Sequence, residues 1–308
     1  MSTMTANRNS TIVRNLFFLL MRAGFRFGSW LRPRATLQRA YRLFCTPLPA
    51  SRKRASVADT GNAVVSRVAL GNDELSLYAW GDPAAEPYVL LAHGWSSHGL
   101  RFNAWIEPLR SAGYAIVAFD QIGHGLSSGE RTTLPGFAAV LAEVGRRHGP
   151  AAAVIGHSLG GAATMLALAE GLVAERAILI APAADPIDAA RRFGRMVGLA
   201  DYLCAHLFDE YEARRSTRVA SLQAHLHAPR IGRPALIVHD LADREVPWAE
   251  GERYARHWPH SRLLTTTGLG HHHIVDDRTV IDAGLEFLRG GIVGERVVSS
   301  SNLPFGFA

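Results

Sequence analysis

Three residues of the chain have the chemistry of a nucleophile, an acid and a base: Ser158, Asp243 and His271, in that order. A serine hydroxyl attacks an acyl carbon efficiently only when a base accepts its proton. An imidazole can be that base if a carboxylate holds its tautomer and stabilises the imidazolium that forms. The three side chains therefore predict nucleophilic acyl chemistry, provided that the fold brings them together.

The sequence around Ser158 predicts a sharp turn between a buried strand and a helix. An apolar run over 152–155 precedes Gly156, and an apolar helical pattern follows over 159–170. Such a turn strains the serine backbone and requires tiny residues two positions away on each side, and Gly156 and Gly160 satisfy this. The competing interpretation is an ordinary strand–loop–helix connection with a chance serine, since Gly-x-Ser-x-Gly alone is common.

The acid and the base are expected in loops that follow two later strands. The strand 235–239 runs into Asp240 and Asp243, and the strand 262–265 leads to His271. The carboxyl ends of parallel strands share one edge of a sheet, so both loops lie on the face that holds the serine turn. We expect the acid to be Asp243 rather than Asp240, Asp276 or Asp277, because Asp240 sits at the strand end while Asp243 lies in a loop that can bend toward the histidine.

Three consecutive histidines complicate the choice of base. We assign the base to His271, because it follows Gly270 directly in a Gly-x-Gly-His turn. Side chains of neighbouring residues in an extended loop point apart, so only one of the three can readily meet Ser158. His272 and His273 are therefore not expected to be essential.

An oxyanion hole is predicted from two backbone N–H groups. The strand 88–92 ends in His93-Gly94-Trp95, and the loop after this strand supplies the Trp95 N–H, with Gly94 allowing close approach. The second donor is the Leu159 N–H, which lies at a helix N-terminus. His93 is interpreted as a residue that braces the loop.

Alternating strand and helix patterns predict a mostly parallel, doubly wound α/β sheet. A hairpin over 64–80 opens a body that we place at 61–290, and β–α units follow. About fifty residues between two strands have helical patterning, and we interpret 185–230 as a cap over the active face. The competing interpretation is a pair of core helices without a role in access. Residues 1–60 form a basic extension and linker, and 291–308 form a tail.

The basic charge of the chain is concentrated near its N-terminus. Residues 1–58 contain eleven Arg or Lys and no acid, whereas the rest carries 22 basic and 27 acidic residues. A nucleic-acid role for the folded body therefore has no support. The two cysteines, Cys45 and Cys204, lack metal-ligand spacing and are expected to be unbridged thiols. No metal is predicted.

Residues 8–31 carry too many charges for a membrane-spanning helix. On a helix, Arg8, Arg14, Arg22 and Arg26 share an arc of about 120°, and the apolar residues Phe17, Leu20 and Phe27 occupy the remainder. Such a helix can lie on an anionic membrane surface. A disordered extension and a transit peptide are the alternatives. We expect a cytoplasmic protein that is peripheral to the membrane.

Taken together, the motifs resemble those of the α/β-hydrolase superfamily, in its esterase, lipase and serine-aminopeptidase-like branch. They are His-Gly-Trp, Asp-x-x-Gly-His-Gly-x-Ser, Gly-His-Ser-Leu-Gly-Gly, Asp-x-x-Val-Pro and Gly-x-Gly-His, spread over about 62–289. The resemblance implies the α/β-hydrolase fold, a triad of Ser158, His271 and Asp243, acyl-enzyme chemistry and no cofactor.

The favoured function is hydrolysis of a carboxylic ester or related small-molecule acyl substrate. Acyl transfer and peracid formation use the same triad and stay open as alternatives. A non-catalytic ligand-binding member of the fold is a third interpretation, but such a protein would not need all five catalytic positions. The sequence does not identify the acyl chain, the leaving group or the oligomeric state.

Overall fold

The computed structural model describes residues 2–215 and 217–297, with the side chains of 2–15 and 17 left aside. The predicted roles of Arg8, Arg14 and Phe17, and of the tail beyond 297, therefore lie outside the described residues. The chain divides into two compact units. We call Thr46–Asp185 with Leu222–Ala308 the sheet unit, and Met1–Cys45 with Pro186–Ser221 the helical unit.

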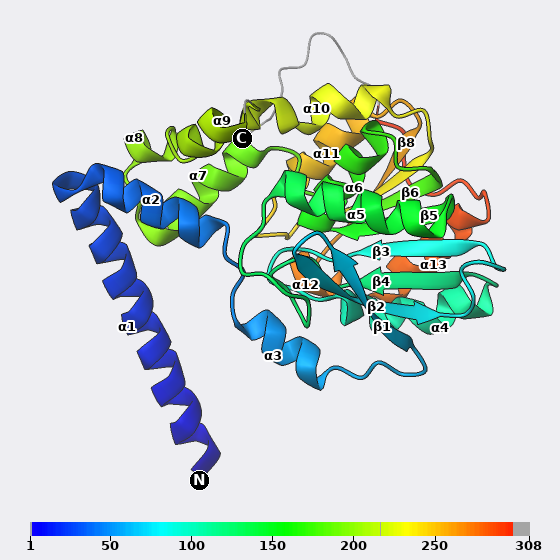
Figure 1. Ribbon diagram of the computed structural model, residues 1–308, viewed down its shortest axis with the longest axis horizontal. Helices are drawn as coiled ribbons and strands as arrows, with labels where there is room; N and C mark the ends of the chain where they lie inside the picture. Colours follow the sequence, from blue (N-terminus) through cyan, green and yellow to red (C-terminus); the bar gives the residue numbers. More distant parts are fainter. Residues whose placement is uncertain (1, 216, 298–308) are drawn as a thin grey trace. The chain divides into compact units, whose positions relative to one another are not determined.

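The sheet unit is built on an eight-stranded sheet with the order β1-β2-β4-β3-β5-β6-β7-β8 (Figure 1). Strand β1 pairs antiparallel with β2, and β2 pairs antiparallel with β4, while every other neighbouring pair is parallel. The predicted mostly parallel, doubly wound sheet is thereby confirmed. The strands are β1 Val64–Leu70, β2 Asp73–Trp80, β3 Tyr88–Ala92, β4 Ala115–Phe119, β5 Ala151–His157, β6 Ala174–Ile180, β7 Ala235–Asp240 and β8 Ser261–Thr266.

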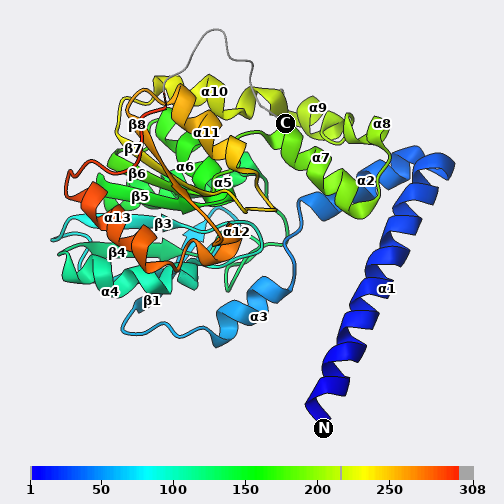
Figure 2. The same ribbon diagram turned by 180° about the vertical axis from the view of Figure 1, so that it is seen from behind.

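Helices cover both faces of this sheet, which explains why β3 and β4 are apolar throughout and fully buried. Helices α4 (Asn103–Ser111) and α13 (Arg278–Leu288) cover one face (Figure 2). Helices α5 (Leu134–His148), α6 (Leu159–Ala169) and α11 (Trp248–His257) cover the other. Trp105 of α4 is fully buried and donates its indole N–H to the Val275 carbonyl oxygen over 2.8 Å.

The helical unit joins the start of the chain to the insertion between β6 and β7. Its helices are α1 Ser2–Leu31, α2 Pro33–Phe44, α7 Pro186–Val197, α8 Asp201–Cys204 and α9 Asp209–Arg215. Phe44 of α2 packs edge-on against Phe193 and Phe208 of the insertion, with ring centroids 5.2 and 5.5 Å away. Phe25 of α1 is buried in the same apolar cluster. The two segments, distant in sequence, therefore share one core.

The end of the extension and linker that the sequence predicted over 1–60 contains a helix, α3 (Ala50–Val57). Arg52 of α3 donates to the carbonyl oxygens of Gly125, Ser127 and Gly129, over 3.3, 2.8 and 2.7 Å. These polar contacts hold α3 on the sheet unit. The sequence predicted a linker because the segment is polar. The carbonyl oxygens that bind Arg52 are far away in the sequence, so the local residue pattern does not reveal this contact.

Among the helices of the described residues, none combines the length and the apolar character needed to cross a membrane. A short turn of helix, α12 (Gly270–His273), follows β8, and another, α10 (Ala224–His227), follows the insertion.

Candidate active site

Ser158 lies at the turn between β5 and α6, with φ 55° and ψ −119°. A positive φ is unfavourable for a side chain with a Cβ, so the surroundings must hold this conformation. The Ser158 N–H donates to the Ile180 carbonyl oxygen over 2.9 Å. The flanking glycines leave no room for larger residues: a Cβ on Gly156 would lie 2.6 Å from the Gly160 oxygen, and one on Gly160 only 2.1 Å from the Ala92 oxygen.

The structure brings the predicted nucleophile, base and acid together. Ser158 Oγ lies 3.0 Å from His271 Nε2, and His271 Nδ1 lies 2.7 Å from Asp243 Oδ2. The His271 side chain is 6% exposed and that of Asp243 is fully buried. Both nitrogens of one imidazole are thus within hydrogen-bonding distance of the groups that a proton relay requires.

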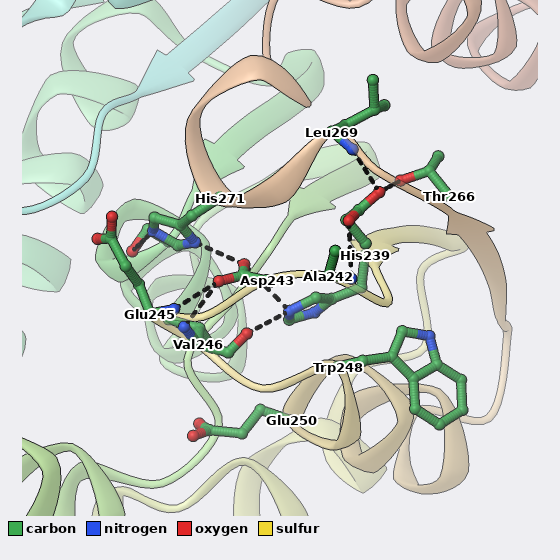
Figure 3. A network of polar contacts seen from close by, with 12 residues as sticks. His239, Ala242, Asp243, Glu245, Val246, Trp248, Glu250, Thr266, Leu269 and His271 are labelled. Atoms are coloured by element: carbon green, nitrogen blue, oxygen red, sulfur yellow. Dashed lines mark hydrogen bonds and ion pairs between the residues drawn. The ribbon is translucent and has the colours of Figure 1, made fainter.

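Four groups of the protein hold the Asp243 carboxylate in place (Figure 3). Oδ1 accepts the N–H groups of Glu245 and Val246 over 2.8 and 2.9 Å. Oδ2 accepts from His271, and His239 Nε2 lies 3.5 Å from the same oxygen. Burial alone would raise the pKa of Asp243, but the hydrogen bonds from His239 and His271 outweigh burial and hold this pKa well below its ordinary value.

Asp240, the alternative acid, faces other partners. Its Oδ1 accepts the Ala242 N–H over 2.8 Å, and its Oδ2 accepts from Thr266 Oγ1 and the Leu269 N–H over 2.8 and 3.0 Å. These contacts tie the end of β7 to the segment that leads to His271. Asp240 therefore braces the loop, and it is the Asp243 carboxylate that reaches the imidazole.

The three histidines lie on the helical turn α12, whereas the sequence interpretation placed them in an extended loop. On a helix, successive side chains are rotated by about 100°, so the expected divergence of the three rings still follows. His271 points to Ser158, and His272 Nε2 lies 2.9 Å from the Glu245 carboxylate in an exposed ion pair. The His273 side chain is exposed.

Two residues that the sequence reasoning missed hold the backbone of this turn. Arg101 binds both carboxylate oxygens of Asp276, over 2.6 and 2.8 Å, and also donates to the His272 carbonyl oxygen. His157 is buried and donates from Nε2 to the His271 carbonyl oxygen over 2.9 Å. Burial and the neighbouring His271 hold the pKa of His157 well below its ordinary value. Its position directly before Ser158 was the one signal that could have pointed to it.

The loop after β3 lies directly against Ser158. A Cβ on Gly94 would be 3.1 Å from Ser158 Cβ, so glycine is what lets this backbone approach Ser158 closely. Trp95 follows in the same loop, and Leu159 is the first residue of α6. Within 2–215 and 217–297, neither of these two N–H groups donates to a protein acceptor, which is the state that an oxyanion hole requires.

Neutral histidines brace this loop. His93 Nε2 accepts the Gln121 N–H over 3.0 Å and its Nδ1 donates to the Gly94 oxygen over 2.8 Å. His124 Nε2 accepts the Ser96 N–H over 3.0 Å. A ring nitrogen can accept only when it carries no proton. Burial agrees with this protonation state, because it lowers the pKa of His93 and takes that of His124 to about 3.

No group of three or more His, Cys, Asp or Glu side chains within the described residues is arranged to hold a metal ion. The predicted absence of a metal site and of a cofactor stays a prediction.

Comparisons with known proteins place this geometry in context. A family model described as serine aminopeptidase, S33, matches residues 83–224. The pimeloyl-[acyl-carrier protein] methyl ester esterase of Xanthomonas oryzae pv. oryzae (strain MAFF 311018) is 30% identical over 225 residues, which cover 60% of this chain and 88% of that protein. A monoglyceride lipase homolog of Monkeypox virus is 29% identical over 108 residues, covering 32% of this chain and 39% of that protein.

Solved structures resemble the chain in fold. A thioesterase domain from the curacin biosynthetic pathway has a TM-score of 0.56 at 19% identity, with 74% of this chain and 100% of that domain covered. A membrane phospholipase A, described as a bacterial virulence factor, has a TM-score of 0.58 at 18% identity, with 90% and 98% covered. A putative lipase of Acinetobacter baumannii AYE has a TM-score of 0.58 at 16% identity, with 82% and 96% covered.

Proposed function

Because the chain belongs to the α/β-hydrolase superfamily, we propose that it is a serine hydrolase that cleaves a carboxylic ester of a small acyl substrate. The observation that carries the proposal is the continuous contact from Ser158 Oγ through both His271 nitrogens to the Asp243 carboxylate, over 3.0 and 2.7 Å. The esterase and lipase names of the relatives support the same class of reaction.

In the first half of the reaction, Ser158 Oγ attacks the ester carbonyl carbon while His271 Nε2 accepts the hydroxyl proton. The Asp243 carboxylate keeps the other ring nitrogen protonated and stabilises the imidazolium. The N–H groups of Trp95 and Leu159 bind the oxyanion, and each such donor is worth about 10²- to 10³-fold in rate. His271 then protonates the departing alcohol, which leaves an ester on Ser158.

In the second half, water takes the place of the alcohol. His271 removes a proton from the water, the resulting hydroxide attacks the acyl carbon, and the collapse of the second tetrahedral intermediate returns the proton to Ser158 Oγ. The products are the carboxylic acid and free enzyme.

The test uses a fluorophosphonate probe, followed by nitrophenyl esters of increasing acyl length. We expect the intact protein to be labelled, and Ser158→Ala to lose both the label and at least about 10³-fold of its turnover. Ser111→Ala, which alters an exposed serine of α4, is the matched control and should keep both. A Ser158→Ala variant that retains most of its turnover would refute the proposal.

The same experiment separates the alternatives. If added alcohol yields a new ester faster than free acid forms, the protein is an acyltransferase. If hydrogen peroxide yields a peracid faster than free acid forms, it is a perhydrolase. An intact protein that takes up no label and turns over no ester would indicate a ligand-binding member of the fold.

Two parts of the sequence interpretation are proposals separate from this chemistry. One is that the insertion acts as a cap which controls access of the substrate. The other is that residues 8–31 contact a membrane surface.

A further inference from the structure

Helix α1 has two long faces with opposite environments. One face enters the core of the helical unit: Phe25 and Ser29 are each 2% exposed. The Ser29 Oγ accepts the Ala200 N–H over 3.3 Å, and the Tyr202 hydroxyl donates to the Ser29 carbonyl oxygen. This face is therefore occupied by the insertion.

The opposite face carries large apolar side chains that are exposed. At about 100° per residue they fall within an arc of about 120° that is centred opposite Phe25. Its members, with their exposed fractions, are Leu16 (54%), Leu19 (64%), Leu20 (65%), Phe27 (64%), Trp30 (79%) and Leu31 (53%). We call these six residues the α1 apolar face. A contiguous exposed patch of this kind marks a surface that has a partner.

Arginines border the α1 apolar face along one edge. On the same helical projection, Arg26 lies about 20° outside Leu19, and Arg22 about 40° further round. Both side chains are exposed. The Arg22 guanidinium also donates to the carbonyl oxygens of Arg195 and Met196, over 3.1 and 3.2 Å. The edge of the face is thereby fixed to the insertion.

The two units of the chain differ in charge. The helical unit contains fourteen arginines and five acidic residues, whereas the sheet unit contains nineteen basic and twenty-two acidic residues. The apolar face thus lies on the strongly basic part of the protein. Its partner must supply apolar surface and negative charge together.

We propose that the helical unit docks on an anionic lipid bilayer through the α1 apolar face. Trp30, Phe27 and the leucines enter the boundary between headgroups and acyl chains, and Arg26 meets lipid phosphates. A second copy of this chain fits less well, because it would bring arginine edges and basic units together. Since the insertion shares a core with α1, it is carried to the membrane as well.

The sequence placed Arg22 and Arg26 on one arc of this helix and the apolar residues on the remainder. In the structure, Arg22 at that arc holds the insertion, and the lipid-facing surface is the apolar arc beside it, with Arg26 at the boundary. Leu20 and Trp30 are exposed, so they are available to a membrane and do not form part of the core.

The test is co-sedimentation of the full chain with vesicles of phosphatidylcholine alone or mixed equally with phosphatidylglycerol. The intact protein should bind the anionic vesicles at low salt and bind at least tenfold more weakly in 0.5 M salt. Leu20→Asp with Phe27→Asp should reduce binding at least tenfold. Ile292→Asp, at a position 78% exposed on the sheet unit, is the matched control and should bind like the intact chain.

Two further measurements keep the outcomes distinct. The tryptophan emission should shift to shorter wavelength with anionic vesicles, and Trp30→Phe should remove most of that shift. Turnover of a soluble ester should be unchanged in the double variant, which shows that it is folded and separates this test from that of the proposed function. The proposal would be overturned if the intact chain does not bind the anionic vesicles at low salt. It would also be overturned if the intact chain is a dimer in solution that binds no vesicles, while the double variant is a monomer.

Discussion

The imidazole of His157 donates a hydrogen bond to the backbone carbonyl oxygen of His271 over 2.9 Å. The two rings lie with their centroids 4.8 Å apart. His157 is the last residue of β5 and directly precedes Ser158. The strand that leads to Ser158 therefore also holds the turn that carries His271.

Replacing His157 should slow the chemical step. We expect His157→Leu to lower kcat by about 10- to 100-fold with little change in KM, because a small displacement of a catalytic group carries a large rate penalty. His157→Gln can still donate from its amide, so it should recover part of the loss. Steady-state kinetics on a soluble ester give the measurement, and a Leu variant with normal kcat would show that the contact does not position His271.

The two aspartates after β7 should fail in different ways. Asp243→Asn should reduce kcat/KM by up to about 10⁴-fold, through the wrong histidine tautomer. Asp240→Asn should chiefly reduce the free energy of unfolding, by about 1–3 kcal/mol, because it weakens the bonds to Thr266 and to two backbone N–H groups. Kinetics and denaturant unfolding of both variants separate the effects. A larger kinetic defect in Asp240→Asn would reverse the assignment.

Of the three histidines in α12, only His271 should be essential. His271→Ala should lose at least about 10³-fold in turnover. The side chain of His272 is 66% exposed and paired with Glu245, which raises its pKa, and it has no contact with Ser158 among the described interactions. His272→Ala and His273→Ala should therefore keep most of their turnover. Loss of activity confined to either of these two variants would move the base to that residue.

Stability should fall as the pH is lowered from about 6.5 toward 4. Burial lowers the pKa of His98 to about 4 and that of His124 to about 3, whereas a histidine in the unfolded chain has a pKa near 6.5. In this window the unfolded chain binds more protons than the folded chain. The free energy of unfolding therefore falls by about 1.4 kcal/mol per pH unit for each histidine that stays neutral in the folded chain. The lowered pKa of Asp243 reduces the free energy of unfolding only at still lower pH. There the carboxylate is protonated in the unfolded chain while it is still ionised in the folded chain.

Denaturant unfolding at several pH values between 4 and 7 measures the slope of the free energy of unfolding against pH. His98→Gln should flatten it, and His260→Gln, at an exposed position, should leave it unchanged. A slope that both variants share with the intact protein would rule out His98 as a source of the acid sensitivity.

Much of the site could be predicted from the sequence, because the turn at Ser158 and the loops after β7 and β8 are each formed by a short stretch of the chain. The serine turn needs only a buried strand, two glycines and a helix, and the order of strands places Asp243 and His271 at the same sheet edge. The supporting contacts were not predictable in this way. Glu245 meets its partner His272 only when the loop after β7 meets α12 in space, and Arg52 binds carbonyl oxygens more than seventy residues away.

The packing of the N-terminal helix α1 could not be predicted from local sequence either. Periodicity in residues 8–31 indicates an amphipathic helix, but it does not say which arc packs and which stays exposed. That choice depends on the insertion, which supplies Phe193 and Phe208 to the common core. The sequence therefore described the faces of α1, and the structure shows that the face with Phe25 is the packed one.

The division of the helical unit into two distant segments also has a consequence for synthesis on the ribosome. About 140 residues, Thr46–Asp185, separate its two parts. At about 5–20 residues per second, α1 and α2 leave the ribosome roughly 7 to 28 seconds before α7. During that interval Phe25 and Phe44 lack the partners that later bury or contact them. The nascent chain must pass through a stage in which the insertion does not yet cover the Phe25 face of α1, and β7 can join β6 only after the insertion has been made.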